Sequence, residues 1–182
     1  IMISGYDTKG VSVLRLWAAK SPVFDMESFN RGDYANALGG NTNVEVISKI
    51  LYPNDNHPQG KALRLKQQYF MVSASIHDII RRHVTTYGSM DNFAEKNAIH
   101  INDTHPALCI PELMRILIDE NGYSWDDAWY IVTKTVAYTN HTVMSEALEK
   151  WSEDLIARRL PRIHMILREI NQRFCGEMWD KF

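Results

Sequence analysis

The sequence predicts an α/β protein that is rich in helix, with about eight helices and three short strands. Two observations predict this class. The longest apolar repeat, over residues 59–84, has helical spacing and would extend for about 40 Å. Two short apolar runs, over 98–102 and 136–139, each precede polar residues and then a helical pattern, which is typical of strands in βα units. A chain of 182 residues with 45% apolar composition is long enough to bury a core.

Composition and charge exclude several classes of function. The formal net charge of -2 argues against a strongly basic nucleic-acid binder, and no apolar run approaches the roughly 20 residues of a membrane span. The start of the chain lacks the charged and long apolar parts of a signal peptide. The two cysteines, Cys109 and Cys175, are too few for a disulfide framework, so we expect free thiols and a cytoplasmic location.

The pattern in the first third of the chain predicts one strand and several helices. Residues 11–17 alternate between apolar and polar side chains, as in a strand. Residues 25–38 are predicted to form one or two short helices with Asp25 as N-cap, and the glycine pair at 39–40 is expected to end them. Residues 43–51 return to helical spacing, and a polar loop then leads into the long helix.

Caps and breaks predict the middle helices. Pro111 lies early in a helix over 111–121, where its missing N–H costs little. Gly122 is expected to stop that helix in the left-handed conformation. Ser124 and an acidic residue three positions later open the next helix, which runs to residue 135.

The remaining elements are connections and a helical end. Residues 85–96 are predicted to be a polar connection. Ser145 is expected to cap a short helix over 146–151. The chain then finishes with a helical pattern over 152–174, which restarts at Pro161.

Three polar stretches are candidates for one ligand site. They cover residues 54–57, 102–105 and 140–142, and the last two follow predicted strands. Ligands of open α/β sheets bind outside the carboxyl ends of the strands, so the three stretches could converge on one crevice. Their amide and carboxylate side chains suit a hydroxyl-rich ligand. The alternative is that they serve turns and caps, with Asp103 or Thr104 capping the next helix.

The residues support other chemistry less well. Asp103, His105 and His141 could bind a metal, although their spacing is not typical of metal ligands. Arg81-Arg82 could bind phosphate, although arginines near helix ends more often complement the helix dipole. The sequence shows no glycine-rich phosphate loop and no lysine in the context of a Schiff base. The residues alone therefore predict a soluble α/β piece with a polar crevice and no complete catalytic set.

Several longer motifs carry a resemblance to a known family. They are Leu14-Arg-Leu-Trp17, Leu51-Tyr-Pro-Asn-Asp-Asn56, Leu63-Arg-Leu-Lys-Gln67, Asn102-Asp-Thr-His-Pro106, Pro111-Glu-Leu-Met-Arg115, Tyr138-Thr-Asn-His-Thr142, Glu146-Ala-Leu-Glu149 and Ile170-Asn-Gln-Arg-Phe174. In this order they resemble the α-glucan phosphorylases, the glycogen, starch and maltodextrin enzymes. The loop ending at His57-Pro58 is most similar to the bacterial type.

The resemblance implies a GT-B (Rossmann-like) fold for the parent enzyme, with two domains and the active site between them. Residues 1–182 resemble the later part of the amino-terminal domain, so we expect a single partial domain without the cofactor domain. The resemblance also implies pyridoxal 5'-phosphate as the cofactor of the parent. None is expected to bind this piece, because the lysine that holds it belongs to the other domain.

The implied reaction is phosphorolysis of terminal α-1,4-glucosidic bonds of glycogen or maltodextrin to glucose 1-phosphate. Its partners are an α-1,4-glucan and inorganic phosphate, and the parent is expected to be a homodimer. This piece alone is expected to be inactive and to self-associate through apolar surface. Arg81-Arg82 match the pair that binds AMP in animal members, but bacterial-type members generally lack that allosteric activation. The alternative is a non-catalytic carbohydrate-binding or interaction module that retains the fold.

The resemblance also implies roles for individual residues. His141 is similar to the histidine that binds the glucosyl 6-hydroxyl and aims its backbone carbonyl at the developing positive charge. Asn56 is similar to the residue that binds the 2-hydroxyl. Asn54 and Asp55 belong to a gate loop, in which Asp55 affects catalysis. Five further residues resemble the polar lining beside the β-face of the glucose, and none is implied to bind metal: Arg64, Asp103, His105, Glu146 and Glu149.

Overall fold

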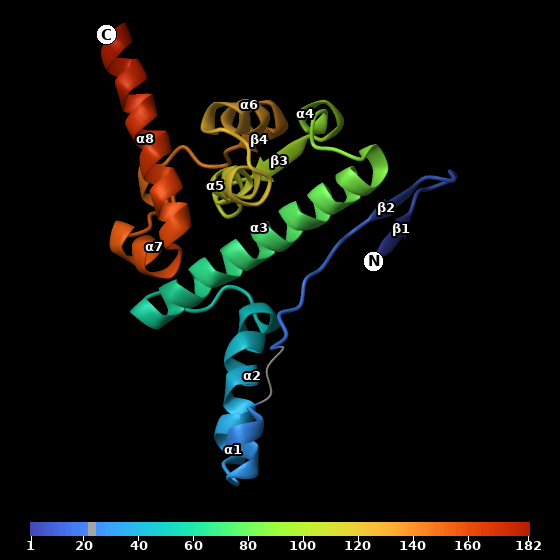
Figure 1. The fold of residues 1–182 in the computed structure, drawn as a ribbon, viewed down its shortest axis with the longest axis vertical. Coiled ribbons are helices and arrows are strands. Elements are labelled where there is room, and N and C mark those ends of the chain that lie inside the picture. Colours follow the sequence, from blue (N-terminus) through green and yellow to red (C-terminus); the bar gives the residue numbers. More distant parts are fainter. Residues whose placement is uncertain (22–24) are drawn as a thin grey trace. The chain divides into compact units, whose positions relative to one another are not determined.

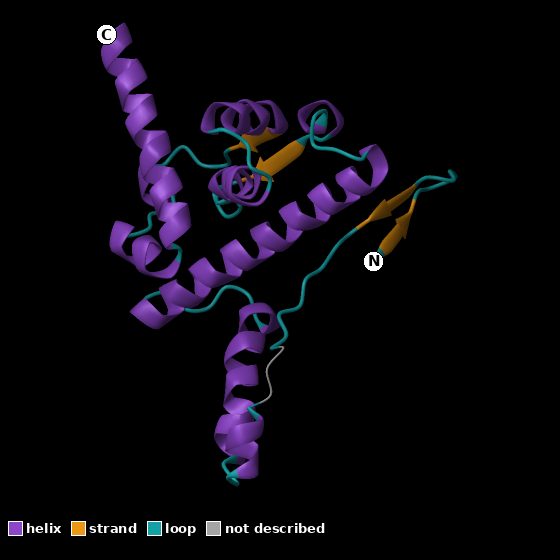
Figure 2. Cartoon of the chain, viewed as in Figure 1, coloured by secondary structure: helices purple, strands orange, loops and turns teal. Residues whose placement is uncertain are grey.

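The structure is a computed structural model that describes residues 1–21 and 25–182. Helices predominate, and the strands are short and form two two-stranded sheets (Figure 1, Figure 2). The predicted helix-rich α/β class is therefore confirmed. The chain divides into two compact units, Ile1–Met71 and Val72–Phe182, which are described separately.

Unit 1 begins with a small hairpin and continues with helices. Its elements are β1 (Met2–Ser4), β2 (Val11–Val13), α1 (Met26–Asn30), α2 (Tyr34–Lys49) and the first half of α3 (Pro58–Tyr87). β1 and β2 pair antiparallel, with Met2 opposite Val13. The strand predicted over 11–17 is thus shorter than expected. Its partner was missed because three residues are too few to show an alternating pattern.

Aspartate side chains cap the first two helices of unit 1. Asp25 accepts hydrogen bonds from the backbone N–H groups of Glu27 and Ser28, as predicted. Hydrogen bonds from the hydroxyl and the N–H of Ser28 hold the pKa of Asp25 below its ordinary value. Asp33 caps α2 in the same way, through the N–H of Asn36.

The predicted helix end at Gly39-Gly40 is wrong. α2 continues to Lys49 and ends at Ile50, whose backbone is extended. A glycine inside a helix costs only about 1 kcal/mol relative to alanine, so a glycine pair weakens a helix without stopping it.

Unit 2 contains a parallel pair of strands and most of the helices. Its elements after α3 are α4 (Phe93–Lys96), β3 (Ile99–Asn102), α5 (Cys109–Arg115), a π-helical turn (Ile116–Glu120), α6 (Trp125–Thr135), β4 (Val136–Thr139), a 3-10 turn (Ser145–Ala147), α7 (Glu153–Arg159) and α8 (Pro161–Lys181). β3 and β4 are parallel, with Ile99 opposite Val136 and Asn102 opposite Thr139. Their carboxyl ends therefore lie at the same edge, as a β–α–β connection requires.

The core of unit 2 is built around α5. Leu113 and Met114 are fully buried, and α5 contacts both α6 and α8. Burial also raises the pKa of the Cys109 thiol to about 12, so this cysteine is a packing residue and not a nucleophile. Figure 1 shows the last turns of α8 extending away from the other elements of unit 2, where most residues are exposed.

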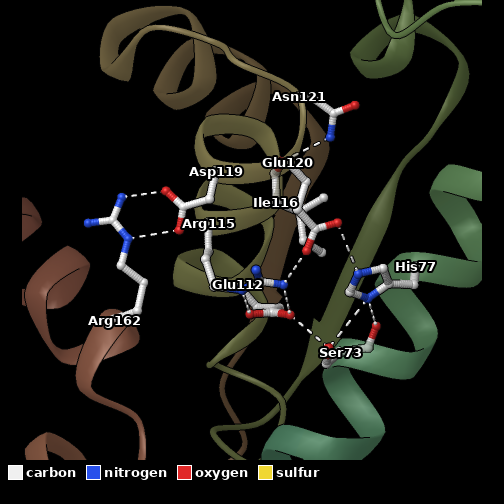
Figure 3. A network of polar contacts seen from close by, with 9 residues as sticks. All are labelled: Ser73, His77, Glu112, Arg115, Ile116, Asp119, Glu120, Asn121 and Arg162. Atoms are coloured by element: carbon white, nitrogen blue, oxygen red, sulfur yellow. Dashed lines mark hydrogen bonds and ion pairs between the residues drawn. The ribbon is translucent and has the colours of Figure 1, made fainter.

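A buried carboxylate joins three elements within unit 2 (Figure 3). Glu112 on α5 is 0% exposed and accepts two hydrogen bonds from Arg115, at 2.8 and 2.9 Å. It accepts a third from the Ser73 hydroxyl on α3, at 2.7 Å. Arg115 also donates to Glu120 in the π-helical turn, and Glu120 lies 3.4 Å from Nε2 of His77. These bonds offset the large cost of removing a carboxylate from water.

Most of the predicted helix boundaries in unit 2 are confirmed. The hydroxyl of Ser124 accepts from the N–H of Asp127 at the start of α6. Gly122 ends the preceding helical segment with φ 74°. Pro161 begins α8, which runs several residues farther than predicted.

The helix predicted after Ser145 is wrong. The structure has only the 3-10 turn there, and the hydroxyl of Ser145 does not cap it. Among the described side chains of this stretch, Glu146 and Leu148 are exposed and Trp151 is only half-buried, so tertiary packing gives a short helix here little support. Residues 85–96 also differ from the prediction, because they include the short helix α4, whose Phe93 is fully buried.

Within the described residues, the structure contains no helix that is both long and apolar enough to cross a membrane.

Replacing Arg115 tests the buried network. We expect Arg115→Met to lower the free energy of unfolding by about 3–5 kcal/mol, because Glu112 keeps its charge and loses its main partner. Urea denaturation measures this value. Arg158→Met is the matched control, since Arg158 pairs with Asp154 on the exposed surface of α7, and it should cost less than about 1 kcal/mol. Equal losses in the two variants would contradict the interpretation.

A second ion pair in unit 2 predicts an acid-sensitive contribution to stability. Arg162 donates two hydrogen bonds to Asp119, at 2.8 and 2.6 Å, and they hold the pKa of Asp119 below its ordinary value of 3.8. A lowered carboxylate pKa stabilises the fold above the unfolded-state pKa, and this contribution is lost as the pH falls through the lower, folded-state value.

We therefore expect Asp119→Asn to destabilise the fold by about 1 kcal/mol at neutral pH. The difference from wild type should begin to shrink below about pH 4, where the carboxylate of the unfolded chain becomes protonated, and should disappear as the pH falls through the lower pKa of the folded state. Urea denaturation at several pH values measures both effects. Asp154→Asn, in an exposed pair, should show a smaller difference at every pH. A difference for Asp119→Asn that stays constant down to pH 2 would rule out the ion pair as its cause.

Candidate functional site

The carboxyl edge of β3 and β4 carries a row of polar side chains. On β3, Ile101 is buried while His100 and Asn102 are exposed, so the strand presents one polar face. Nε2 of His100 lies 2.6 Å from the Thr139 hydroxyl on β4. Nε2 of His141, two residues beyond β4, forms a hydrogen bond with Oδ1 of Asn102. The predicted stretches 102–105 and 140–142 therefore meet at this edge.

Asp103 makes the turn that follows β3. Its N–H donates to the carbonyl of Thr139 at 2.8 Å, and its own Oδ1 accepts from the N–H of Thr104 at 2.6 Å. Its φ of 68° is left-handed, a conformation that aspartate tolerates better than most residues. The prediction that Asp103 or Thr104 caps the next helix is wrong. The N-cap of α5 is Leu108, and no side chain caps that helix.

The other predicted residues of unit 2 lie on the segments that follow the two strands. His105 follows β3 and is exposed, and Glu146 in the 3-10 turn after β4 is also exposed. Glu149 is half-buried. In the part of the chain that the structure describes, no three His, Cys, Asp or Glu side chains are grouped as metal ligands. The metal hypothesis for Asp103, His105 and His141 therefore gains no support from the geometry.

The predicted gate loop lies in unit 1, between α2 and α3. Oδ1 of Asn54 accepts from the N–H of Asn56 at 3.0 Å, which closes a tight polar turn. Asp55 lies 3.9 Å from Nε of Arg64, and the Arg64 guanidinium lies over the ring of Tyr52. Asn54 and Asn56 are exposed. The amide groups of the loop are thus exposed to solvent, while Arg64 on α3 contacts Asp55 of the loop.

Two further residues of α3 fasten this loop. The buried Gln67 donates to the carbonyl of Ile50 at 2.7 Å. Gly60 lies so close to the loop that an added Cβ would stand 1.8 Å from the carbonyl oxygen of Asn54 and 3.2 Å from Cα of Asp55. These neighbours are backbone atoms, so the loop itself would have to move to admit a side chain.

The predicted site residues are therefore divided between the two units. Asn54, Asp55, Asn56 and Arg64 belong to unit 1, and the remaining five belong to unit 2. Their convergence on one crevice stays a prediction. Unit 2 also has two surface hollows of about 480 Å³ each, and neither is lined by a predicted site residue.

Both arginines of the Arg81-Arg82 pair have an acidic partner. Arg81 and Arg82 each donate to Asp78, at 2.6 and 2.9 Å, one turn earlier on α3. An anion at these arginines would have to compete with a carboxylate that is already in place. This arrangement favours the helix-surface interpretation over the phosphate site.

No individual role was predicted from the sequence for three residues that shape these regions, although Asn102 lies in the predicted stretch 102–105. Asn102, His100 and Gly60 stand out only when the paired strands and the loop contact are known. Asn102 and His141 are 39 residues apart, as are His100 and Thr139. A parallel register between the two predicted strands would have revealed both pairs.

Comparison with known proteins identifies the family. A helix-rich α/β chain with a polar edge on a parallel strand pair is compatible with a piece of a GT-B domain. The family model for carbohydrate phosphorylases matches residues 1–182, and the chain belongs to this family. The predicted resemblance is confirmed.

Three relatives illustrate the similarity. The chain is 49% identical over 187 residues to a glycogen phosphorylase of Bacillus subtilis (strain 168), with all of this chain and 22% of the relative covered. It is 55% identical over 173 residues to glycogen phosphorylase 2 of Dictyostelium discoideum, which covers 94% of this chain and 17% of the relative. It is 50% identical over 189 residues to the muscle form of glycogen phosphorylase of Ovis aries, and this match covers 99% of this chain and 22% of the relative.

The chain thus spans about a fifth of the length of these relatives. The identities to the three organisms are similar, so they do not by themselves assign the bacterial type, which stays a prediction.

The contact between Gly60 and the gate loop can be tested by adding one carbon. We expect Gly60→Ala to lower the free energy of unfolding by about 1–3 kcal/mol, because the new Cβ displaces the backbone of Asn54. Gly176→Ala is the matched control. It also lies within a helix, and nothing lies within 4 Å of its added Cβ. That change should raise stability by up to about 1 kcal/mol. Similar effects of the two substitutions in urea denaturation would contradict the contact.

Proposed function

We propose that the longer protein containing this chain is an α-glucan phosphorylase. It transfers the terminal α-1,4-linked glucosyl unit of glycogen or maltodextrin to inorganic phosphate and releases glucose 1-phosphate. Two facts support this function: the family model covers the whole chain, and the relatives described above are named glycogen phosphorylases. This chain contributes the wall of the active site that contacts the glucosyl unit.

One observation carries the proposal for this chain: the polar edge of β3 and β4, where Asn102 holds His141. Imidazole, amide and carboxylate groups at one sheet edge offer both donors and acceptors to sugar hydroxyl groups. His141 binds the 6-hydroxyl, and its backbone carbonyl faces the positive charge that develops on the sugar ring. Asp103, His105, Glu146 and Glu149 line the pocket beside the β-face.

The gate loop of unit 1 supplies the remaining contacts in this proposal. Asn56 binds the 2-hydroxyl, and Asn54 and Asp55 cover the sugar. Arg64 orients Asp55 through their ion pair and belongs to the same polar lining. A loop that is fastened at its base and exposed at its amide groups suits this role.

Pyridoxal 5'-phosphate is the cofactor that the family implies, and the residues of this chain do not fit it. Holding this cofactor as an imine requires a lysine in an enclosed site. Every lysine of the chain lies on the exposed surface. Residues of the longer protein that lie outside this chain therefore bind the cofactor in this proposal, and the 182 residues alone are inactive. The longer protein acts as a cytoplasmic homodimer.

Activity measurements with a variant test this function. We expect the longer protein, supplied with pyridoxal phosphate, maltodextrin and inorganic phosphate, to release glucose 1-phosphate. His141→Ala should lower kcat/KM by at least about 100-fold, because it removes a contact that is stronger in the transition state. Cys175→Ser, on the exposed part of α8, is a control that should keep wild-type activity.

The contrary outcomes are equally clear. A longer protein that binds maltodextrin without phosphorolysis would support a non-catalytic carbohydrate-binding module instead. Glucose 1-phosphate formation by the 182 residues alone would contradict the proposal that residues outside this chain bind the cofactor.

A further inference from the structure

The two cross-strand hydrogen bonds at the sheet edge follow from one register. In a strand, alternate side chains point to the same face, so His100 and Asn102 share the exposed face of β3. Because Asn102 lies opposite Thr139 on β4, the exposed face of β4 carries Thr139 and leads on to His141. His100 and Asn102 each contact a residue two positions beyond their register partner: His100 is opposite Ala137 and bonds to Thr139, and Asn102 is opposite Thr139 and bonds to His141. The sheet itself therefore brings Asn102 to His141.

The hydrogen bond between Asn102 and His141 selects one form of the imidazole ring. Oδ1 of Asn102 can accept a hydrogen bond but cannot donate one. Since this oxygen faces Nε2 of His141, the ring donates from Nε2. In the neutral imidazole the other nitrogen, Nδ1, then carries a lone pair and accepts hydrogen bonds.

The backbone on both sides of this bond is fixed. Asn102 ends a paired strand, and the next N–H, of Asp103, donates to the carbonyl of Thr139. On the other side, Asn140 closes a small turn around His141. Its Nδ2 donates to the carbonyl of Thr142 at 2.6 Å, and its Oδ1 accepts from the N–H of Thr142 at 3.3 Å. The hydrogen bond therefore joins side chains that extend from two hydrogen-bonded backbone segments.

We propose that Asn102 is a positioning residue for His141. It fixes the orientation and the tautomer of the ring, so that Nδ1 accepts a hydrogen bond from a sugar hydroxyl. Both side chains are exposed, and an exposed imidazole without this partner would rotate and exchange between tautomers. The inference rests on the proposed function, because it takes a hydroxyl group of the glucosyl unit as the donor that binds Nδ1 of His141.

A double-mutant cycle in the longer protein tests this role. Asn102→Leu keeps a similar volume and removes the acceptor, and we expect it to lower kcat/KM for maltodextrin by about 10- to 100-fold. In the background of His141→Ala the same change should lower kcat/KM by less than about 2-fold, because there is no ring left to position. A purely structural role of Asn102 would give the same loss in both backgrounds and would overturn the proposal.

His100→Ala is the matched control for this cycle. It removes the neighbouring cross-strand bond to Thr139 on the same face and leaves the pair of Asn102 and His141 intact. We expect kcat/KM to stay within about 2-fold of wild type. A loss equal to that of Asn102→Leu would show that the sheet edge as a whole matters and would overturn the specific role of Asn102.

The tautomer can be measured without any activity. Nitrogen-15 spectra of histidine-labelled protein distinguish a proton on Nε2 from a proton on Nδ1. We expect the Nε2–H form for His141 and a mixture of both forms in Asn102→Leu. A predominant Nδ1–H form in the wild type would overturn the proposal even if the protein is an active phosphorylase. An inactive wild-type protein with the expected spectra would refute the proposed function and leave the pairing intact.

Discussion

The buried carboxylate of Glu112 is the constraint on which unit 2 depends most. A charge with no exposed surface must be surrounded by donors, and here they come from α3 and α5. Hydrophobic packing alone tolerates small shifts between helices, whereas a set of short, directed hydrogen bonds does not. The network therefore fixes the position of α5, which packs into the same hydrophobic core as Ile101 of β3, one of the two strands that carry the polar edge.

The sequence predicted those parts of the fold that are set by local signals. The N-caps Asp25 and Ser124, the glycine at 122 and the restart at Pro161 act within one helical turn, so each can be recognised from its neighbours. The failures have a different origin. The glycine pair of α2 and the serine at 145 are each a valid local signal, but a glycine pair only weakens a helix and a cap alone does not make one.

The candidate site shows the same division. The polar residues at 102–105 and 140–142 could be found in the sequence because polar side chains follow apolar strands. The pairing of Asn102 with His141 could not, because it depends on the parallel register of strands that are far apart in the chain. The contact of Gly60 with the gate loop was equally hidden, since a missing side chain leaves no pattern. The sequence thus identified the segments that form the candidate site, but it could not predict the contacts between those segments.

The π-helical turn after α5 has a consequence for how this chain can vary. In such a turn the N–H of Asn121 bonds to the carbonyl of Ile116, five residues earlier, so the turn holds one residue more than an α-helix would. The extra residue brings Arg115 and Glu120 to the same face. A homologue that lacks one residue between Arg115 and Glu120 would form a regular α-helix, in which the glutamate follows the arginine by four positions and stays on the same face. A single-residue gap between these two positions in an alignment would therefore be compatible with the same ion pair, whereas a regular α-helix formed without a gap would place Glu120 about 140° around the helix from Arg115.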